Sequence, residues 1–147
     1  MRLVIQRVLN GSVSVEGKNV GAIAKGYVVL VGVCDADTED TVEKMTKKML
    51  HLRLFEDAAG KTNLSLQDVE GELLLISQFT LYADCRRGNR PGFTGAGSPD
   101  HARRLYEYMI SLCRQSCQTE QGIFGADMQV SLVNDGPFTI LLDSAEM

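Results

Sequence analysis

Residues 77–81 combine groups that could act on a carbonyl substrate. They read Ser-Gln-Phe-Thr-Leu and close an apolar run, so Thr80 lies where a strand runs out, next to Gln78 and Phe79. A strand end places polar side chains and free N–H groups at a surface, and such N–H groups can stabilise a developing oxyanion. Thr80 and its neighbours are therefore candidate catalytic residues. The alternative is a threonine that only satisfies a local backbone group.

Residues 134–139, which read Asn-Asp-Gly-Pro-Phe-Thr, form a second informative string between two apolar runs. Glycine has no side chain and proline has no N–H, so the Gly136-Pro137 pair presents bare backbone carbonyls at a predicted tight turn. Rigid backbone atoms can recognise the shape and handedness of a ligand. The pair therefore suggests a site that reads stereochemistry, with a plain turn as the alternative.

Several common kinds of site are not indicated. The four cysteines form no C-x-x-C pair, and with only His51 and His101 as imidazole ligands no zinc spacing is present, so we predict no metal. We expect reduced, structural cysteines, with a reactive role for Cys85 as the alternative. The glycine-rich residues 92–97 lack the G-K-[S/T] ending of a phosphate-binding loop, and no G-x-S-x-G string occurs. We predict no cofactor.

The net charge of −4 argues against binding a long stretch of nucleic acid, because phosphate neutralisation supplies much of that affinity. The charge does not exclude contact with one short end of a nucleic acid. Arginines gather locally, at Arg86, Arg87 and Arg90 and then at Arg103 and Arg104. They are either solvated charges or a small patch that contacts phosphate.

Length and hydropathy indicate one domain over residues 1–147, since 147 residues suit a single core and 44% of them are hydrophobic. No run approaches the ~20 apolar residues of a membrane helix. Arg7 interrupts the first apolar stretch too early for a signal peptide. We expect a soluble, cytoplasmic protein without membrane contact.

The pattern of apolar residues predicts two helices among many strands. One helix follows a cap at Asp37 or Thr38, and the other begins with a capping Ser98 followed by Pro99 and ends near Cys117. The predicted strands, some of them short or weak, cover 3–8, 12–15, 20–23, 27–33, 53–55, 63–66, 72–78, 128–133 and 138–142. The expected fold class is α/β: mixed or antiparallel sheets layered with two helices on one side, in a β/β/α sandwich. Residues 84–97 form a long loop of the kind that is often functional.

These strings, taken together, resemble the D-aminoacyl-tRNA deacylase family over nearly the whole chain. The matching segments are Arg7-Val8 and residues 52–57, 77–82, 88–91, 124–128 and 134–139. One departure is visible: the family usually carries valine between the proline and the threonine, where this chain has Phe138. We expect a local packing change there and no loss of function.

The resemblance implies an esterase that releases D-amino acids from the 3′ end of tRNA, and glycine from mischarged tRNA(Ala). It also implies a homodimer without a metal, in which a cis Gly136-Pro137 unit reaches into the partner's pocket, so that active sites lie at the interface. By resemblance Arg7 braces this unit, while Ser77, Ala102 and Met128 are pocket residues, Met128 near the terminal adenine.

An aminoacyl ester is already activated, so a placed water and a stabilised oxyanion suffice for hydrolysis. We expect the N–H groups of Phe79 and Thr80 to stabilise the oxyanion and Gln78 to position the ester or ribose. A threonine nucleophile needs a base, and none is obvious, so we favour attack by water assisted by the substrate's 2′-hydroxyl. The alternatives are a sister deacylase that removes L-alanine, and a DNA-associated binding module, which the acidic residues 143–147 disfavour.

Overall fold

Strand β1 (Arg2–Val15) organises the sheet in the computed structural model, which describes residues 1–147. Along one edge, β1 pairs antiparallel with β8 (Gln129–Asp143) over nearly its whole length. Along the other edge it pairs first with β3 (Gly26–Gly32) and then with β2 (Lys18–Ile23), both antiparallel. Because β1 belongs to both halves, the six strands form one continuous sheet.

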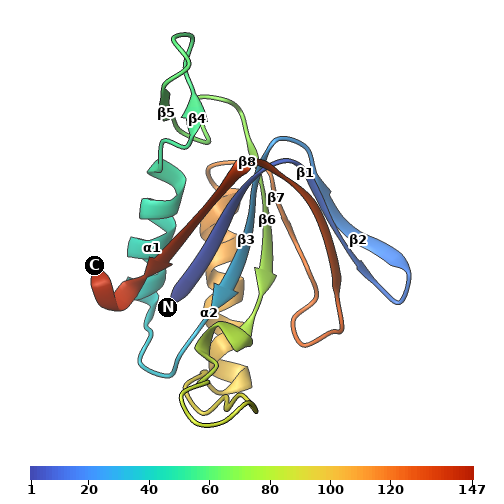
Figure 1. Ribbon diagram of the computed structural model, residues 1–147, viewed down its shortest axis with the longest axis vertical. Helices are drawn as coiled ribbons and strands as arrows, with labels where there is room; N and C mark the ends of the chain where they lie inside the picture. The colour runs from blue at the N-terminus through green and yellow to red at the C-terminus, as the bar shows by residue number, and fades with distance from the viewer.

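The rest of this sheet is parallel. Strand β6 (Glu72–Ser77) pairs with β3, and β7 (Thr119–Gln121) pairs with β6. A separate hairpin of β4 (Phe55–Glu56) and β5 (Thr62–Leu64) projects from one end of the molecule (Figure 1).

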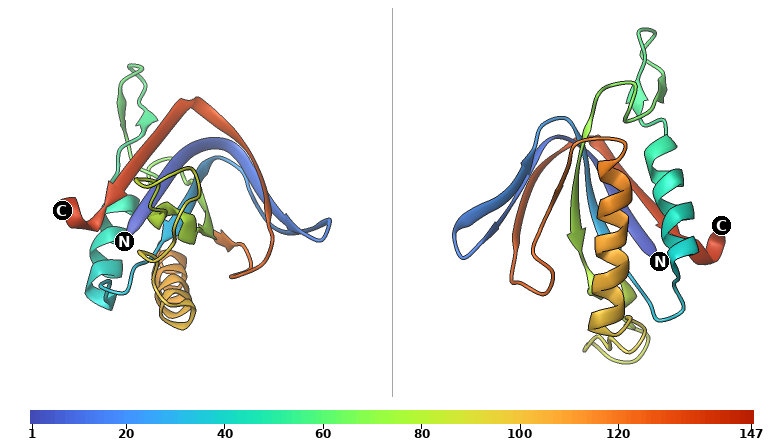
Figure 2. Two further views of the ribbon diagram at one scale, coloured as in Figure 1. Left: turned by 60° about the horizontal axis from the view of Figure 1, so that its bottom comes forward. Right: turned by 180° about the vertical axis from the view of Figure 1, so that it is seen from behind.

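Both helices cover the same face of the sheet, α1 (Glu39–His51) beside α2 (Pro99–Arg114) (Figure 2, right). Strands β1 and β8 bend midway, so the sheet folds over and its two halves form two layers (Figure 2, left). The expected α/β class with mixed strands and two helices on one side is confirmed, and the two strand layers are parts of one bent sheet.

Local sequence explains where α1 begins and which face it buries. The Thr38 hydroxyl accepts a hydrogen bond from the N–H of Thr41, and the Thr41 hydroxyl accepts one from the N–H of Thr38. This reciprocal cap satisfies N–H groups that the helix itself leaves unpaired. The buried residues Val42, Met45 and Met49 recur at three- and four-residue steps, as expected.

In α2, Pro99 occupies the first turn, as predicted, but the Ser98 side chain makes no capping hydrogen bond. The Ser98 N–H instead donates to Asp35 Oδ1, which ties the start of the helix to the segment after β3. The helix ends at Arg114 and not near Cys117.

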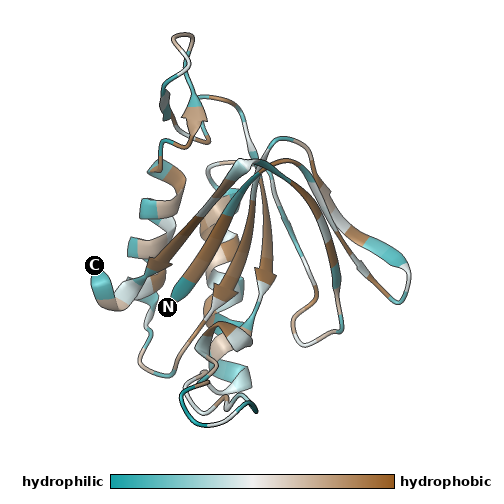
Figure 3. Ribbon diagram, viewed as in Figure 1, coloured by the Kyte–Doolittle hydropathy of each residue, from teal (hydrophilic) through white to brown (hydrophobic).

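The main core lies between the sheet and the helices, where brown strands face the helical layer in Figure 3. It includes Leu3 and Ile5 from β1 together with Leu105 and Met109 from α2, all fully buried. A smaller cluster fills the inside of the bend. Its members are Val8, Val13, Ile23, Val28, Leu74 and Ile76. Neither helix is long and apolar enough to cross a bilayer.

Two strand predictions are corrected. Residues 3–8 and 12–15 belong to one strand, β1, and residues 128–133 and 138–142 belong mostly to one strand, β8. The expected tight turn at 134–137 is wrong, because Gln6 pairs with Thr139 and Val8 with Asn134. The four residues 135–138 therefore lie opposite Arg7 alone and form a long bulge in the ladder. Strand β7, which is short and polar, was not predicted.

Candidate functional site

A cavity of about 380 Å³ lies at the carboxyl ends of the parallel strands β3 and β6. In open sheets the crevice outside the carboxyl ends of parallel strands is a common ligand site. The 13 residues that line it come from both strands, the loop after β6, the start of α2 and the segment after β7. They are Val31, Val33, Ser77, Gln78, Phe79, Phe93, Ala96, Gly97, Pro99, Ala102, Tyr106, Phe124 and Gly125.

The predicted catalytic string forms a single turn at the mouth of this cavity. Residues Phe79–Tyr82 make the 3-10 helix η1, and Gln78 precedes it. The Gln78 side-chain amide donates a 2.6 Å hydrogen bond to Thr80 Oγ1. The N–H of Leu81 closes the turn by donating to the Gln78 carbonyl, whereas the N–H groups of Phe79 and Thr80 have no acceptor within the helix. Two donors are thus available for an oxyanion.

Thr80 has no general base beside it. Its hydroxyl has one side-chain partner, the Gln78 amide, which is a donor and cannot remove a proton. Asp84, four residues further along the chain, binds Arg86, and His101 Nε2 contacts the Asp37 carbonyl at 3.0 Å. The arrangement therefore favours a positioned water over a threonine nucleophile.

Aromatic rings make the cavity suitable for a flat ligand group. Phe79 and Phe93 meet edge to face with centroids 5.1 Å apart, and Phe124 lies 6.0 Å from Tyr106. Tyr106 is a wall residue without a proton to give, because its hydroxyl donates to the Leu75 carbonyl and burial raises its pKa. A nucleobase could stack on such rings. Ala102, a predicted pocket residue, lies on the floor and leaves space that a larger side chain would fill.

The bulge at Gly136-Pro137 forms a second predicted group. Its peptide bond is cis, and both residues are exposed. Within the bulge, Asn134 Oδ1 accepts from the Phe138 N–H at 2.8 Å, and Asn134 Nδ2 donates to Thr139 Oγ1 at 2.9 Å. Its conformation is therefore fixed by side-chain bonds from within the same strand.

Arg7 holds this bulge from below. Its side chain is buried, donates to the Asp135 carbonyl at 3.1 Å and to the Leu54 carbonyl at 2.6 Å, and lies 4.7 Å from the ring centroid of Phe138. The aromatic ring that replaces the expected valine is thus used as a stacking surface for the guanidinium. Arg7 therefore contacts the bulge directly, and its bracing role stays a prediction.

Within one chain the two groups are far apart. Leu3 pairs with Val31, and Val31 pairs with Ser77, which places the cavity near the start of β1. Arg7, beneath the bulge, lies four residues further along β1, a distance of about 13 Å. The cavity therefore contains Ser77, Gln78, Phe79 and Ala102, with Thr80 at its mouth, but neither Gly136 nor Pro137. Met128 also lies outside, packed against the smaller core cluster.

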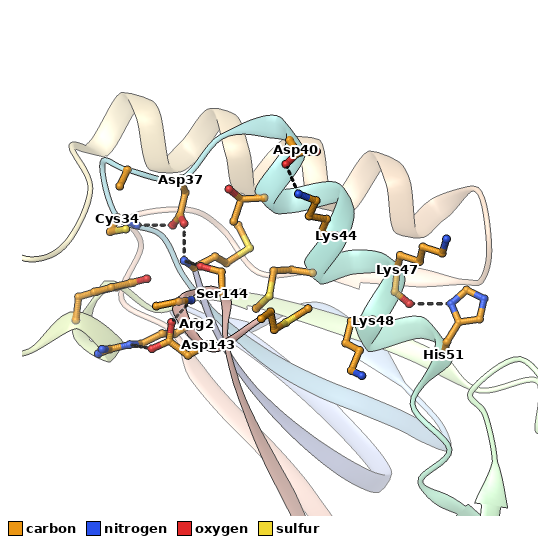
Figure 4. Close-up of a pocket in the computed structure, with 17 residues that line it drawn as sticks. Arg2, Cys34, Asp37, Asp40, Lys44, Lys47, Lys48, His51, Asp143 and Ser144 are labelled. Carbon is orange, nitrogen blue, oxygen red and sulfur yellow. Dashed lines mark hydrogen bonds and ion pairs between the residues drawn. The ribbon is translucent and has the colours of Figure 1, made fainter.

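A larger hollow of about 850 Å³ lies between α1 and the end of β8 (Figure 4). Most of its charges already have partners. The amino group of Met1 contacts Asp37 Oδ1 at 2.5 Å and Ser144 Oγ at 2.6 Å; Arg2 pairs with Asp143 at 2.8 Å. Lys44 pairs with Asp40. Because few polar groups are free to turn toward a ligand, we do not assign the site here.

The cysteines and the possible metal ligands are the remaining candidates for a functional role. Burial raises the pKa of the Cys113 thiol to about 12 and also raises the pKa of Cys117, so both stay protonated. All four cysteines are free thiols. No three His, Cys, Asp or Glu side chains come together in a way that could hold a metal ion.

Comparison with known proteins identifies the class. Residues 4–143 match the family model described as D-Tyr-tRNA(Tyr) deacylase. The chain is 52% identical to a D-aminoacyl-tRNA deacylase of Thermosipho africanus, covering 100% of this chain and 99% of the relative. It is 53% identical to one of Clostridium novyi, covering 98% and 97%. The chain therefore belongs to the D-aminoacyl-tRNA deacylase family, a family of hydrolases, and the resemblance seen in the sequence is confirmed.

Solved structures agree with the fold. One described as a c-Myc DNA unwinding element binding protein superposes with a TM-score of 0.92 at 40% identity, over 97% of this chain and 98% of that one. Another, described as a probable eukaryotic D-amino acid tRNA deacylase, has a TM-score of 0.85 at 17% identity and covers 96% and 97%. The second shows the same fold.

Sequence reasoning did not find the aromatic part of the cavity. Phe93 and Phe124 line it, but in the sequence they lie in a glycine-rich loop and in a family-matching segment, and neither pattern indicates a cavity wall. The one available signal was the length of the loop at residues 84–97, which supplies Phe93, Ala96 and Gly97 to the wall.

Proposed function

We propose that this protein hydrolyses the ester bond between a D-amino acid and the 3′ end of tRNA, and that it also removes glycine from mischarged tRNA(Ala). The reaction would take place in the cytoplasm. The observation that carries the proposal is the pair of uncommitted N–H groups, from Phe79 and Thr80, at the mouth of an aromatic-walled cavity. A terminal adenine that stacks in this cavity would bring its aminoacyl ester to these donors.

In the proposed reaction, water attacks the ester carbonyl carbon, and the resulting oxyanion accepts hydrogen bonds from the two N–H groups. The 2′-hydroxyl of the terminal ribose takes the proton of the attacking water and passes it on. The bond to the ribose oxygen then breaks, that oxygen takes up the proton, and free amino acid and tRNA leave. Gln78 holds the Thr80 hydroxyl in place beside the ester.

Selection for handedness would come from the exposed carbonyls of Gly136 and Pro137. If these oxygens hold the α-ammonium, a D side chain points to solvent, whereas an L side chain strikes the backbone. The wall is rigid because Arg7 and Asn134 fix the bulge from two sides. Glycine, which has no side chain, would pass the same wall.

Because the bulge lies about 13 Å along the sheet from its own cavity, the proposed site needs a second copy of the chain. A homodimer in which each bulge enters the partner's cavity would complete both sites. Exposed apolar side chains near the bulge and the cavity support such an interface. They include Leu9, Phe79, Val133 and Leu141, which are 53%, 56%, 47% and 66% exposed. The outer edge of β8 is also unpaired.

The deciding experiment is a side-by-side hydrolysis assay with D-tyrosyl-tRNA, L-alanyl-tRNA and glycyl-tRNA(Ala). We expect hydrolysis of the first and third and none of the second. Hydrolysis of L-alanyl-tRNA without D-tyrosyl-tRNA would place the chain in the sister branch.

A second candidate, DNA binding, is favoured only by the description of one solved relative. Its test is retention of the protein on duplex DNA at physiological salt, which its net charge of −4 argues against. DNA retention without hydrolysis of any aminoacyl-tRNA would support this candidate in place of the deacylase.

A further inference from the structure

The segment from Asp84 to Arg104 carries five arginines and only two aspartates, in a chain whose net charge is −4. The structure divides these arginines into two sets. Arg86 binds both carboxylate oxygens of Asp84 at 2.8 Å, and Arg104 contacts Glu39 at 2.6 Å. Arg87, Arg90 and Arg103 are exposed and take part in none of the ion pairs.

These three arginines flank the cavity. The Arg103 guanidinium lies 5.0 Å from the ring centroid of Phe124, a wall residue. Arg90 precedes Phe93, another wall residue, by three positions, so their Cα atoms lie within about 11 Å. The loop that carries Arg87 and Arg90 lies below η1 and the start of α2 in Figure 1 and includes teal segments in Figure 3.

The loop is pinned at its base, which gives the two arginines a defined location. Asp84 and Gly92 exchange two backbone hydrogen bonds, of 2.7 and 2.9 Å. The Asp84 carboxylate is neutralised by Arg86, which also holds the pKa of Asp84 well below its usual value. The one acidic group of the loop is therefore already paired, and the outward charge belongs to Arg87 and Arg90.

We propose that Arg87, Arg90 and Arg103, hereafter the arginine rim, bind backbone phosphates of the tRNA acceptor end while its terminal adenosine occupies the cavity. This inference rests on the proposed function and adds the surface that recognises the rest of the substrate. Guanidinium groups bind phosphate oxygens in a bidentate manner, which suits them to this task. The lysines of α1 are less suited to bind phosphate. Lys44 is paired with Asp40, and the acidic residues Glu39 and Glu43 lie on the same helix.

An acidic protein with one basic rim should bind a short end of a nucleic acid and not a long duplex. Each phosphate contact contributes about 0.7 to 0.9 to the slope of log affinity against log salt. The arginine rim would therefore give a shallow salt dependence, with a slope of about 2 to 3.

The test compares D-tyrosyl-tRNA with D-tyrosyl-adenosine, which has the ester and the base but no phosphate. The variants are the double substitution Arg87→Gln with Arg90→Gln, and the single substitution Arg103→Gln. Arg104→Gln is the matched control, because it removes an arginine of the same segment that is already paired with Glu39. The readout is the ratio of kcat/KM for the tRNA substrate to kcat/KM for the adenosine substrate.

We expect this ratio to fall about threefold for each arginine removed, and about tenfold for the double variant. The salt slope of KM for the tRNA substrate should fall by about 1.5 in the double variant. Arg104→Gln should leave the ratio within twofold of wild type. Uncharged tRNA should compete with substrate, whereas inorganic phosphate at the same ionic strength should not.

Equal ratios in wild type and the double variant would overturn the arginine rim while leaving the proposed function intact. Competition by inorganic phosphate as strong as that by tRNA would also overturn it, because the rim would then bind a free anion. A wild-type protein that hydrolyses neither substrate would overturn the proposed function itself, together with this inference.

Discussion

The amide of Gln78 donates a 2.6 Å hydrogen bond to the hydroxyl oxygen of Thr80, and no acid or base shares that hydroxyl. We therefore expect Thr80→Ala to lower kcat by only about tenfold, the effect of losing one hydrogen bond. Single-turnover hydrolysis of D-tyrosyl-tRNA measures this directly. Thr62→Ala, an exposed threonine of the projecting hairpin, is the control.

Complete loss of hydrolysis in Thr80→Ala would instead identify the threonine as the nucleophile. A substrate whose terminal adenosine lacks the 2′-hydroxyl separates the two mechanisms further. It should be resistant to the wild-type enzyme if the substrate assists its own hydrolysis.

Gly136→Val should abolish hydrolysis while the protein remains folded. A Cβ atom at this position would lie 3.2 Å from Arg7 Nη2 and 3.2 Å from the Phe138 nitrogen, and the backbone φ of +133° disfavours any side chain. We expect a loss of about 1–2 kcal/mol in the free energy of unfolding, measured in urea. Gly17→Val has a φ of +76° with open space around it, so it should show a similar destabilisation with full activity.

Ala102→Leu should raise KM for aminoacyl-tRNA by filling the cavity floor. Ala102 is 9% exposed and faces both the cavity and the core, so we expect a destabilisation of about 1–3 kcal/mol from overpacking. Ser111→Leu, on the exposed face of the same helix, should leave KM unchanged. Unchanged KM in Ala102→Leu would show that substrate does not enter this cavity.

Mixing the Gly136→Val protein with the Ala102→Leu protein tests whether each active site is built from two chains. A heterodimer of Gly136→Val and Ala102→Leu has one site in which both the bulge and the cavity are wild type. After subunit exchange we expect about a quarter of the wild-type activity from two proteins that are each impaired alone. Failure to recover activity, with heterodimers shown by mass spectrometry, would contradict the shared site.

Asp143→Asn should make the stability less dependent on pH. Partial burial alone would raise the pKa of Asp143, but the Ala145 N–H and the Arg2 guanidinium together hold it below its usual value. A lowered pKa in the folded state stabilises the protein above about pH 4, and this contribution is lost as the pH falls through the folded value.

Because Arg2 is 39% exposed, we expect the variant to lose only about 0.5–1 kcal/mol at pH 7 and less at pH 3, since the difference from wild type shrinks as the pH falls below about 4. Urea denaturation at both pH values measures this. A difference as large at pH 3 as at pH 7 would show that the side chain acts through packing and not through charge.

The elements that depend on local signals could be predicted from the sequence. The capping threonine and the three- and four-residue spacing of Val42, Met45 and Met49 located α1, and Pro99 located the start of α2. Thr80 could be placed at a strand end because the apolar run before it stops abruptly.

What could not be predicted depends on contacts between distant segments. An Asn-Asp-Gly-Pro string is typical of a turn, and only its pairing with β1, together with Asn134 bonding to Phe138 and Thr139, makes it a bulge. The cavity joins Phe93 to Phe124, and no local pattern relates two phenylalanines 31 positions apart. The separation of the bulge from its own cavity likewise follows from strand register alone.

Strands β1 and β8 both run through the two layers of the sheet, and β3, β2 and β8 all hydrogen-bond to β1. Neither layer can unfold without disrupting the backbone hydrogen bonds that β1 makes to the strands of the other layer. The amide protons of β2 and β3 should therefore exchange with solvent in a single cooperative event, and the turn at Thr80 should lose its geometry at the same point in unfolding as the distant bulge.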